Sequence, residues 1–85
     1  MAQITYQSLF ALLERLGFED RSSSEFERVF DHPARGIVFA FAMLDDPAVD
    51  RAVRPADLTS VEFRLQQEGL LADVLLDEAP RRTEN

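Results

Sequence analysis

The sequence contains no cysteine and no lysine, and the first absence already excludes several kinds of protein. Without cysteine, neither a disulfide nor a thiolate metal site can stabilise the fold, which is consistent with a reducing cytoplasm. The longest apolar run, Ile37 to Leu44, has eight residues, whereas a helix that spans a membrane needs about 20. The residues after Met1 include no basic cluster, so we expect no signal peptide. We therefore expect a cytoplasmic protein that does not enter a membrane.

Positive charge is also scarce. Nine arginines are outnumbered by 16 acidic residues, and the formal net charge is −7 at pH 7. Proteins that bind nucleic acids usually carry a basic face, because the release of counterions from neutralised phosphates drives much of their affinity. RNA and anionic membranes are therefore less favoured partners than a basic protein.

The length of 85 residues and the apolar content of 46% indicate one small globular domain. We place this domain at residues 1–79 and expect a flexible C-terminal tail at 80–85. A domain of this size buries a modest core and often gains stability by pairing with another chain.

Two helices are predicted from apolar residues at helical spacing. Thr5 can cap a first helix that reaches about Leu16 and stops at Gly17. Pro55 suits the first turn of a second helix, which Gly69 would end. A short additional helix is expected between Leu70 and Glu78. The apolar stripes comprise Leu9, Leu12, Leu13 and Leu16 in the first helix, and Leu58, Val61 and Leu65 in the second.

Strands are predicted where the sequence alternates. Phe26 to Asp31 and Ile37 to Leu44 flank the turn D31-H32-P33-A34-R35-G36, so they form a hairpin. A short third strand is expected near Arg51 to Arg54. The fold class is therefore α+β in the order α-β-β-β-α, with a three-stranded antiparallel sheet and the helices on one face.

The two faces of this sheet differ in character. The helices should cover the larger side chains, namely Phe26, Phe30, Phe39 and Phe41. The opposite face should present small or branched apolar residues, namely Val29, Val38, Ala40 and Ala42. Because the second strand contributes no charge to that face, it is a candidate contact surface for a partner protein or for a second copy of the chain.

Several motifs along the chain share their order and separations with one family. They are L-L-E-R-L-G-F (Leu12 to Phe18), V-F-D-H-P (Val29 to Pro33), V-R-P-A-D-L (Val53 to Leu58) and E-G-L-L (Glu68 to Leu71). In these motifs the chain resembles the HicA-like toxin family over roughly Tyr6 to Leu71. The resemblance implies a fold like that of double-stranded-RNA-binding domains (dsRBD-like), cleavage of messenger RNA, and a cognate antitoxin that holds the toxin inactive.

The chain departs from that family at the catalytic motif. The family carries Gly-Ser-His at the start of its first strand, and the resemblance places Glu25, Phe26 and Glu27 at these positions without a gap. His32 then corresponds to a histidine of the turn. A carboxylate at position 27 can act as a base, but it repels the phosphate that it must approach. We therefore expect that ribonuclease activity has been lost.

Two further groups of residues could bind ions. Asp45, Asp46 and Asp50 surround Pro47 and could hold a hard cation, although a solvated acidic loop is favoured and we predict no metal site. Four arginines, each near a predicted strand, could form an anion-binding or RNA-binding patch, or each could pair with a nearby carboxylate. These arginines are Arg28, Arg35, Arg51 and Arg54. No cofactor is predicted.

Three functions stay open on this basis. The favoured one is a protein-binding or regulatory module without catalysis, which fits the acidic composition and the apolar sheet face. The second is an active endoribonuclease toxin of a type II toxin-antitoxin system. The third is a non-catalytic RNA-binding protein.

Overall fold

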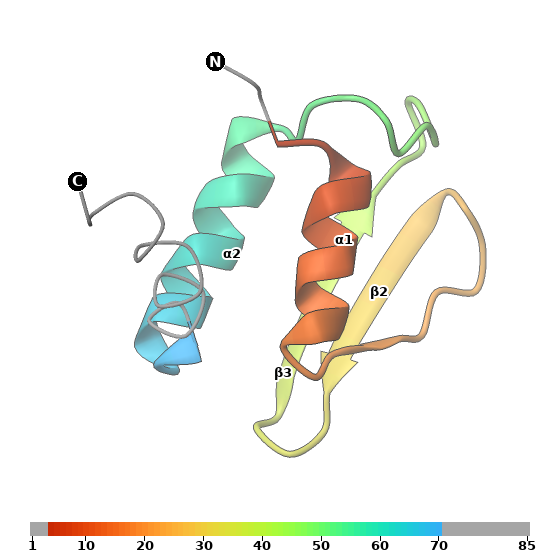
Figure 1. The fold of residues 1–85 in the computed structure, drawn as a ribbon. Coiled ribbons are helices and arrows are strands. Elements are labelled where there is room, and N and C mark those ends of the chain that lie inside the picture. Colours follow the sequence, from red (N-terminus) through yellow and green to blue (C-terminus); the bar gives the residue numbers. More distant parts are fainter. Residues whose placement is uncertain (1–3, 71–85) are drawn as a thin grey trace. The chain divides into compact units, whose positions relative to one another are not determined.

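The computed structural model describes residues 4–70 of the chain, which form two helices and a three-stranded antiparallel sheet. The chain divides between Arg54 and Pro55 into two compact units. The predicted α+β class is confirmed. Most of the helix predicted from Leu70 to Glu78, and the tail at 80–85, lie outside the described residues. The first unit contains α1 (Tyr6–Arg15), β1 (Glu19–Asp20), β2 (Glu27–His32) and β3 (Ile37–Ala42) (Figure 1).

Helix α1 begins and ends where its sequence predicts. The Thr5 hydroxyl oxygen accepts a hydrogen bond from the Ser8 amide at 3.2 Å, which satisfies one of the free donors of the first turn. Gly17 ends the helix with a φ of +103°, a conformation that costs other residues energy. The buried face is broader than the leucine stripe, because Tyr6 and Phe10 join it while Leu12 is only half-buried.

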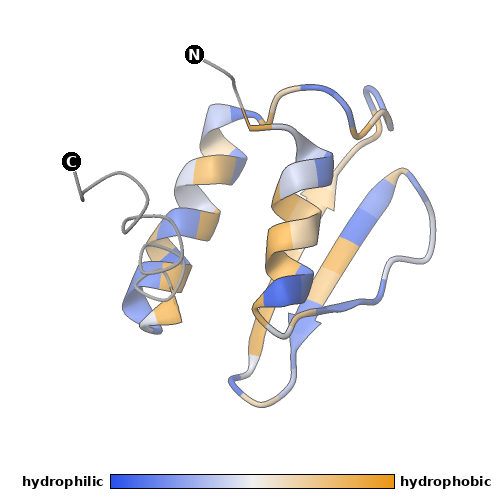
Figure 2. Ribbon diagram, viewed as in Figure 1, coloured by the Kyte–Doolittle hydropathy of each residue, from blue (hydrophilic) through white to orange (hydrophobic). Residues whose placement is uncertain are grey.

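The sheet has the strand order β1-β2-β3, and both pairs of neighbours are antiparallel. Helix α1 covers one face, where the Phe10 ring stacks on Phe30 with centroids 4.7 Å apart and also contacts Phe41 at 5.3 Å. Figure 2 shows hydrophobic residues along the whole of β3, whereas β2 is hydrophilic at both ends and hydrophobic in its middle. The core of this unit therefore lies between α1 and the β2–β3 hairpin.

The prediction of a third strand at Arg51 to Arg54 is wrong. Ala52 instead makes an isolated antiparallel bridge with Thr5, and the Tyr6 and Gln7 amides at the start of α1 donate to the Arg51 and Val49 carbonyls at 3.1 and 2.8 Å. The first amides of a helix have no partner within their own helix. Here they use these carbonyls as acceptors. The third strand is β1, which lies in a segment predicted to be a connection.

Two smaller predictions about the hairpin also need correction. Strand β3 ends at Ala42 rather than Leu44, because the chain turns where the Asp46 amide donates to the Met43 carbonyl at 3.2 Å. Phe26 is not covered by a helix, since 42% of its surface is exposed. It lies before β2 in a tight turn that Ser24 and Glu27 close, where strand alternation no longer sets the direction of a side chain.

The second unit contains α2 (Pro55–Gln67), which begins at the predicted proline. Val61 and Leu65 are buried and lie one turn apart, and Arg64 forms an ion pair with Glu68 at 3.3 Å. Gly69 has a φ of +79°, consistent with a C-terminal cap. Within residues 4–70, neither helix combines the length and apolar character required to cross a lipid bilayer.

Candidate functional site

The candidate site is the sheet face opposite α1, which we call the outer face. The register pairs Glu27 with Ala42, Val29 with Ala40, and Asp31 with Val38, and these six side chains point away from α1. Val38 is 58% exposed, and Ala40 and Ala42 are also exposed. The structure thus brings the four residues predicted for a protein interface onto one side of the sheet. Whether they bind a partner stays a prediction.

A shallow apolar hollow of about 280 Å³ lies at one end of the outer face. Its walls include Phe26 and Leu44, which are 42% and 79% exposed. Ser24, Glu27 and Ala42 complete the lining. Such a hollow can accept an apolar side chain beside a carboxylate. The sequence pattern does not reveal it, because the turns that place Phe26 and Leu44 lie beyond the alternating strands.

Glu27 lies at the edge of this hollow and is the one charged residue among the described residues that line it. Its side chain makes no ion pair or hydrogen bond within residues 4–70, and none of the described residues that line the hollow is basic. Arg28 follows directly but points to the opposite, α1-covered face. Cleavage of RNA through the 2′-hydroxyl requires positive charge near the phosphorane as well as a base. One such group close by is Arg54, which donates to the carbonyl of Ala42, the register partner of Glu27, and its guanidinium is already paired with Asp45.

His32 holds α1 against the sheet. Its Nε2 donates to the Leu16 carbonyl oxygen at 3.1 Å, and its ring meets that of Phe18 edge-on with centroids 5.0 Å apart. The His32 carbonyl in turn accepts the amides of Arg35 and Gly36 in the hairpin turn. Nδ1 is buried and has no hydrogen-bond partner in residues 4–70. Neither ring nitrogen is therefore placed to meet a substrate.

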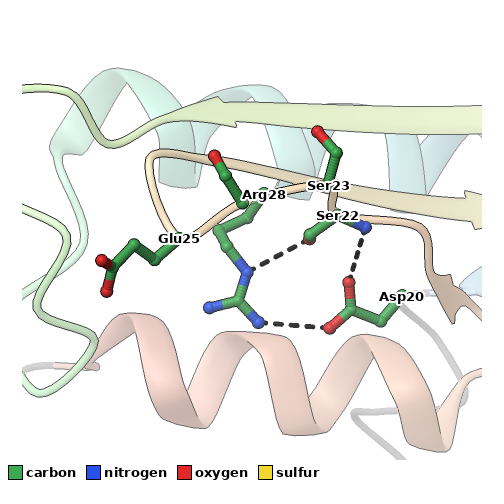
Figure 3. A pocket seen from close by; sticks show the side chains of 6 residues that line it. Asp20, Ser22, Ser23, Glu25 and Arg28 are labelled. Carbon is green, nitrogen blue, oxygen red and sulfur yellow. Dashed lines mark hydrogen bonds and ion pairs between the residues drawn. The ribbon is translucent and has the colours of Figure 1, made fainter.

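Arg28 belongs to a network at the start of β2, shown in Figure 3. Its Nη2 lies 3.1 Å from Oδ2 of Asp20, its Nε donates to the Ser22 hydroxyl at 3.1 Å, and its guanidinium lies 4.9 Å from the centre of the Phe10 ring. Asp20, Ser22 and Arg28 border an open hollow of about 500 Å³. Ser23, Ser24 and Glu25 also line it, so carboxylates outnumber guanidinium groups there.

The network changes the acidity of Asp20. Burial of the carboxyl acts to raise its pKa, but hydrogen bonds from the Ser22 hydroxyl and amide and from Arg28, together with the charge of Arg28, outweigh burial. The pKa of Asp20 is therefore below its ordinary value. The carboxylate form holds β1 and β2 together at this point.

Arg51 and Arg54 come together around the Tyr6 ring. Their guanidinium carbons lie 5.0 and 5.7 Å from its centre. Arg51 donates to the Asp46 carbonyl at 2.6 Å, and Arg54 donates from Nε to the Tyr6 hydroxyl at 2.8 Å. Both also pair with Asp45, at 3.5 and 3.6 Å.

The four arginines predicted as one patch therefore lie at three separate places. Arg51 and Arg54 adjoin the Ala42 end of β3, because Arg54 also donates to the Ala42 carbonyl. Arg35 lies in the turn at the Ile37 end of the same strand. Arg28 pairs with Asp20 at the start of β2. Ion pairing with neighbouring acids, the alternative left open for these arginines, accounts for Arg28, Arg51 and Arg54.

Two of the three aspartates around Pro47 are engaged in the same way. Asp45 and Asp46 form ion pairs with Arg51, and the Asp46 carboxylate also accepts the Ala48 amide at 3.0 Å. Within residues 4–70, no three metal-ligating side chains lie close enough to hold an ion. The loop is thus tied by internal contacts.

Comparisons with known proteins add no identity: no family model, no curated protein and no solved structure matches the chain. The resemblance to HicA-like toxins therefore stays a prediction based on the motifs quoted above.

Proposed function

We propose that the chain is a protein-binding or regulatory module built on a HicA-like, dsRBD-like fold, without ribonuclease activity. The outer face carries this proposal. It offers exposed apolar side chains, a hollow between Phe26 and Leu44, and the carboxylate of Glu27, which is unpaired within residues 4–70. The partner that suits this surface places an apolar side chain in the hollow and a basic one against Glu27. We propose an antitoxin or another regulatory protein as this partner.

The apolar content of the outer face supports protein binding over catalysis or RNA binding. RNA contacts draw on arginine, lysine and exposed aromatic platforms. In β2 and β3, the outer face instead presents Glu27 and Asp31 with valines and alanines. Asp31 pairs with Arg21 at 3.6 Å, so Glu27 is the carboxylate of this face that would repel a phosphate backbone and attract a basic protein segment.

The proposal predicts that a charge introduced at Ala42 weakens binding. The probe is a synthetic peptide in which arginine and valine alternate, titrated by fluorescence anisotropy. Ala42→Arg fills the hollow and sets a positive charge beside Glu27, so binding should weaken by roughly tenfold or more, the scale of one lost interfacial contact.

The matched control is Ala11→Arg, which makes the same chemical change at an exposed position on α1, on the opposite side of the sheet. It should leave the affinity close to that of the original protein. Equal weakening by both variants, or no peptide binding at all, would show that the outer face is not the binding surface.

A further inference from the structure

Three hydrogen bonds show which main-chain groups of β3 point away from β2. The Met43 amide donates to the Phe26 carbonyl at 2.8 Å, and the Arg21 amide donates to the Val29 carbonyl at 2.8 Å. Hydrogen bonding alternates along an antiparallel pair, so the first bond turns residues 37, 39, 41 and 43 toward β2. The second bond shows that the odd-numbered main-chain groups of β2 point toward β1. The even-numbered groups of β2 therefore point toward β3, which agrees with the first bond. The third, from Arg54 to the Ala42 carbonyl, shows directly that Ala42 faces the other way.

The open edge of the sheet is therefore formed by alternate residues of β3. The amide and carbonyl of both Val38 and Ala40, and the amide of Ala42, have no hydrogen-bond partner within residues 4–70. These residues are exposed. Natural sheet edges are commonly protected by a charged residue, a proline or a bulge, because unpaired strands accept other strands. Strand β3 contains none of the three.

The side chains beside this edge specify what can bind there. A strand added to β3 would lie roughly 10 Å from β2, which is two interstrand spacings. Ala40 and Ala42 have short side chains, so little rises above the backbone of β3 on this part of the outer face. A long basic side chain on the added strand can therefore cross β3 and reach Glu27, which has no ion pair within the described residues.

We infer that the exposed edge of β3 is a docking site for an extended, basic segment of a partner protein, which adds to the sheet as a further strand. The inference rests on the proposed function and specifies how the partner is bound. Main-chain hydrogen bonds to Val38, Ala40 and Ala42 supply affinity, and alternate side chains on the outer face supply specificity. A second copy of this chain is a poorer occupant, because each copy carries a net charge of −7.

The test is amide hydrogen exchange, measured by NMR with and without the alternating arginine–valine peptide. The amides of Val38, Ala40 and Ala42 should exchange more slowly in the complex, by tenfold or more at saturation, while exposed amides of α1 keep their rates. A peptide in which glutamate replaces arginine should give no protection. Binding that leaves all three edge amides unprotected would overturn the inference.

A variant pair separates the main chain from the side chains. Ala40→Pro removes an edge amide that β2 does not use, so the β2–β3 pairing is kept while binding should weaken by roughly tenfold. Ala40→Ser retains the amide and should bind like the original protein. If both bind equally while Ala42→Arg still weakens binding, the edge inference fails and the proposed function stands. A dimer mass in light scattering that blocks peptide binding would assign the edge to a second copy and also overturn the inference.

Discussion

At the scale of single residues, the contact between Gly17 and His32 shows how closely the end of α1 meets the sheet. A Cβ atom added at Gly17 would lie 3.0 Å from Nε2 of His32, and the φ of +103° is itself unfavourable for an L-residue. The same nitrogen donates to the Leu16 carbonyl. The only histidine of the chain is thus occupied in joining the helix terminus to β2.

Replacing Gly17 by alanine should therefore destabilise the fold more than the same replacement at Gly36. We expect Gly17→Ala to lower the free energy of unfolding by about 2–3 kcal/mol, from backbone strain together with displacement of His32. Gly36→Ala is the control, because Gly36 also has positive φ, +67°, but a Cβ there meets no atom within 4 Å. Its cost should be about 1 kcal/mol. Urea denaturation measures both, and equal costs would contradict a close Gly17–His32 contact.

At the scale of secondary structure, periodicity predicted the long elements and failed for the short ones. Both helices and the β2–β3 hairpin follow from apolar spacing, and the outer position of Val38, Ala40 and Ala42 follows from alternation. Strand β1 has two acidic residues and hence no pattern to detect; the structure ties it to β2 through the Asp20–Arg28 pair. The hollow was not predictable either, because Phe26 and Leu44 are placed by turns outside the strands.

The pairing of β1 with β2 should depend on the charge of Asp20. Its folded-state pKa is lowered from an ordinary value of 3.8, so the carboxylate stabilises the fold above that pH. This contribution is lost as the pH falls through the lower, folded-state pKa. Asp20→Asn should therefore show a smaller loss of stability on acidification than the original protein.

Thermal unfolding monitored by circular dichroism across the acidic range measures this difference. The control is Asp50→Asn, since Asp50 is exposed and makes no ion pair within residues 4–70. It should leave the acid dependence unchanged. An Asp20→Asn variant that loses stability on acidification as steeply as the original protein would exclude the proposed role of this pair.

At the scale of the whole molecule, most of the arginines in residues 4–70 form an ion pair with a carboxylate. Arg28, Arg51 and Arg54 each pair with an aspartate, whereas Glu27 makes no ion pair in the described chain. A surface with unpaired carboxylates and paired arginines attracts cations and repels polyanions. The charge count in the sequence predicted this balance, but only the structure shows that Glu27 is among the carboxylates left unpaired within residues 4–70.

The protein should consequently leave RNA intact and unbound. After induction in bacteria, growth and transcript integrity should match those of cells carrying an empty vector. Titration of labelled duplex and loop RNAs at low salt, where electrostatic binding is strongest, should give no retardation. Degradation of transcripts that disappears in a Glu27→Ala variant would instead identify an active endoribonuclease, and retardation without cleavage would identify an RNA-binding protein.

Arg54 has a consequence for the length of anything that docks on β3. By occupying the Ala42 carbonyl, its guanidinium closes the ladder at one end, while the Pro33–Gly36 turn closes it at the other. An added strand can therefore pair with only a few residues of β3. A partner docked as we propose would therefore exchange quickly rather than assemble permanently.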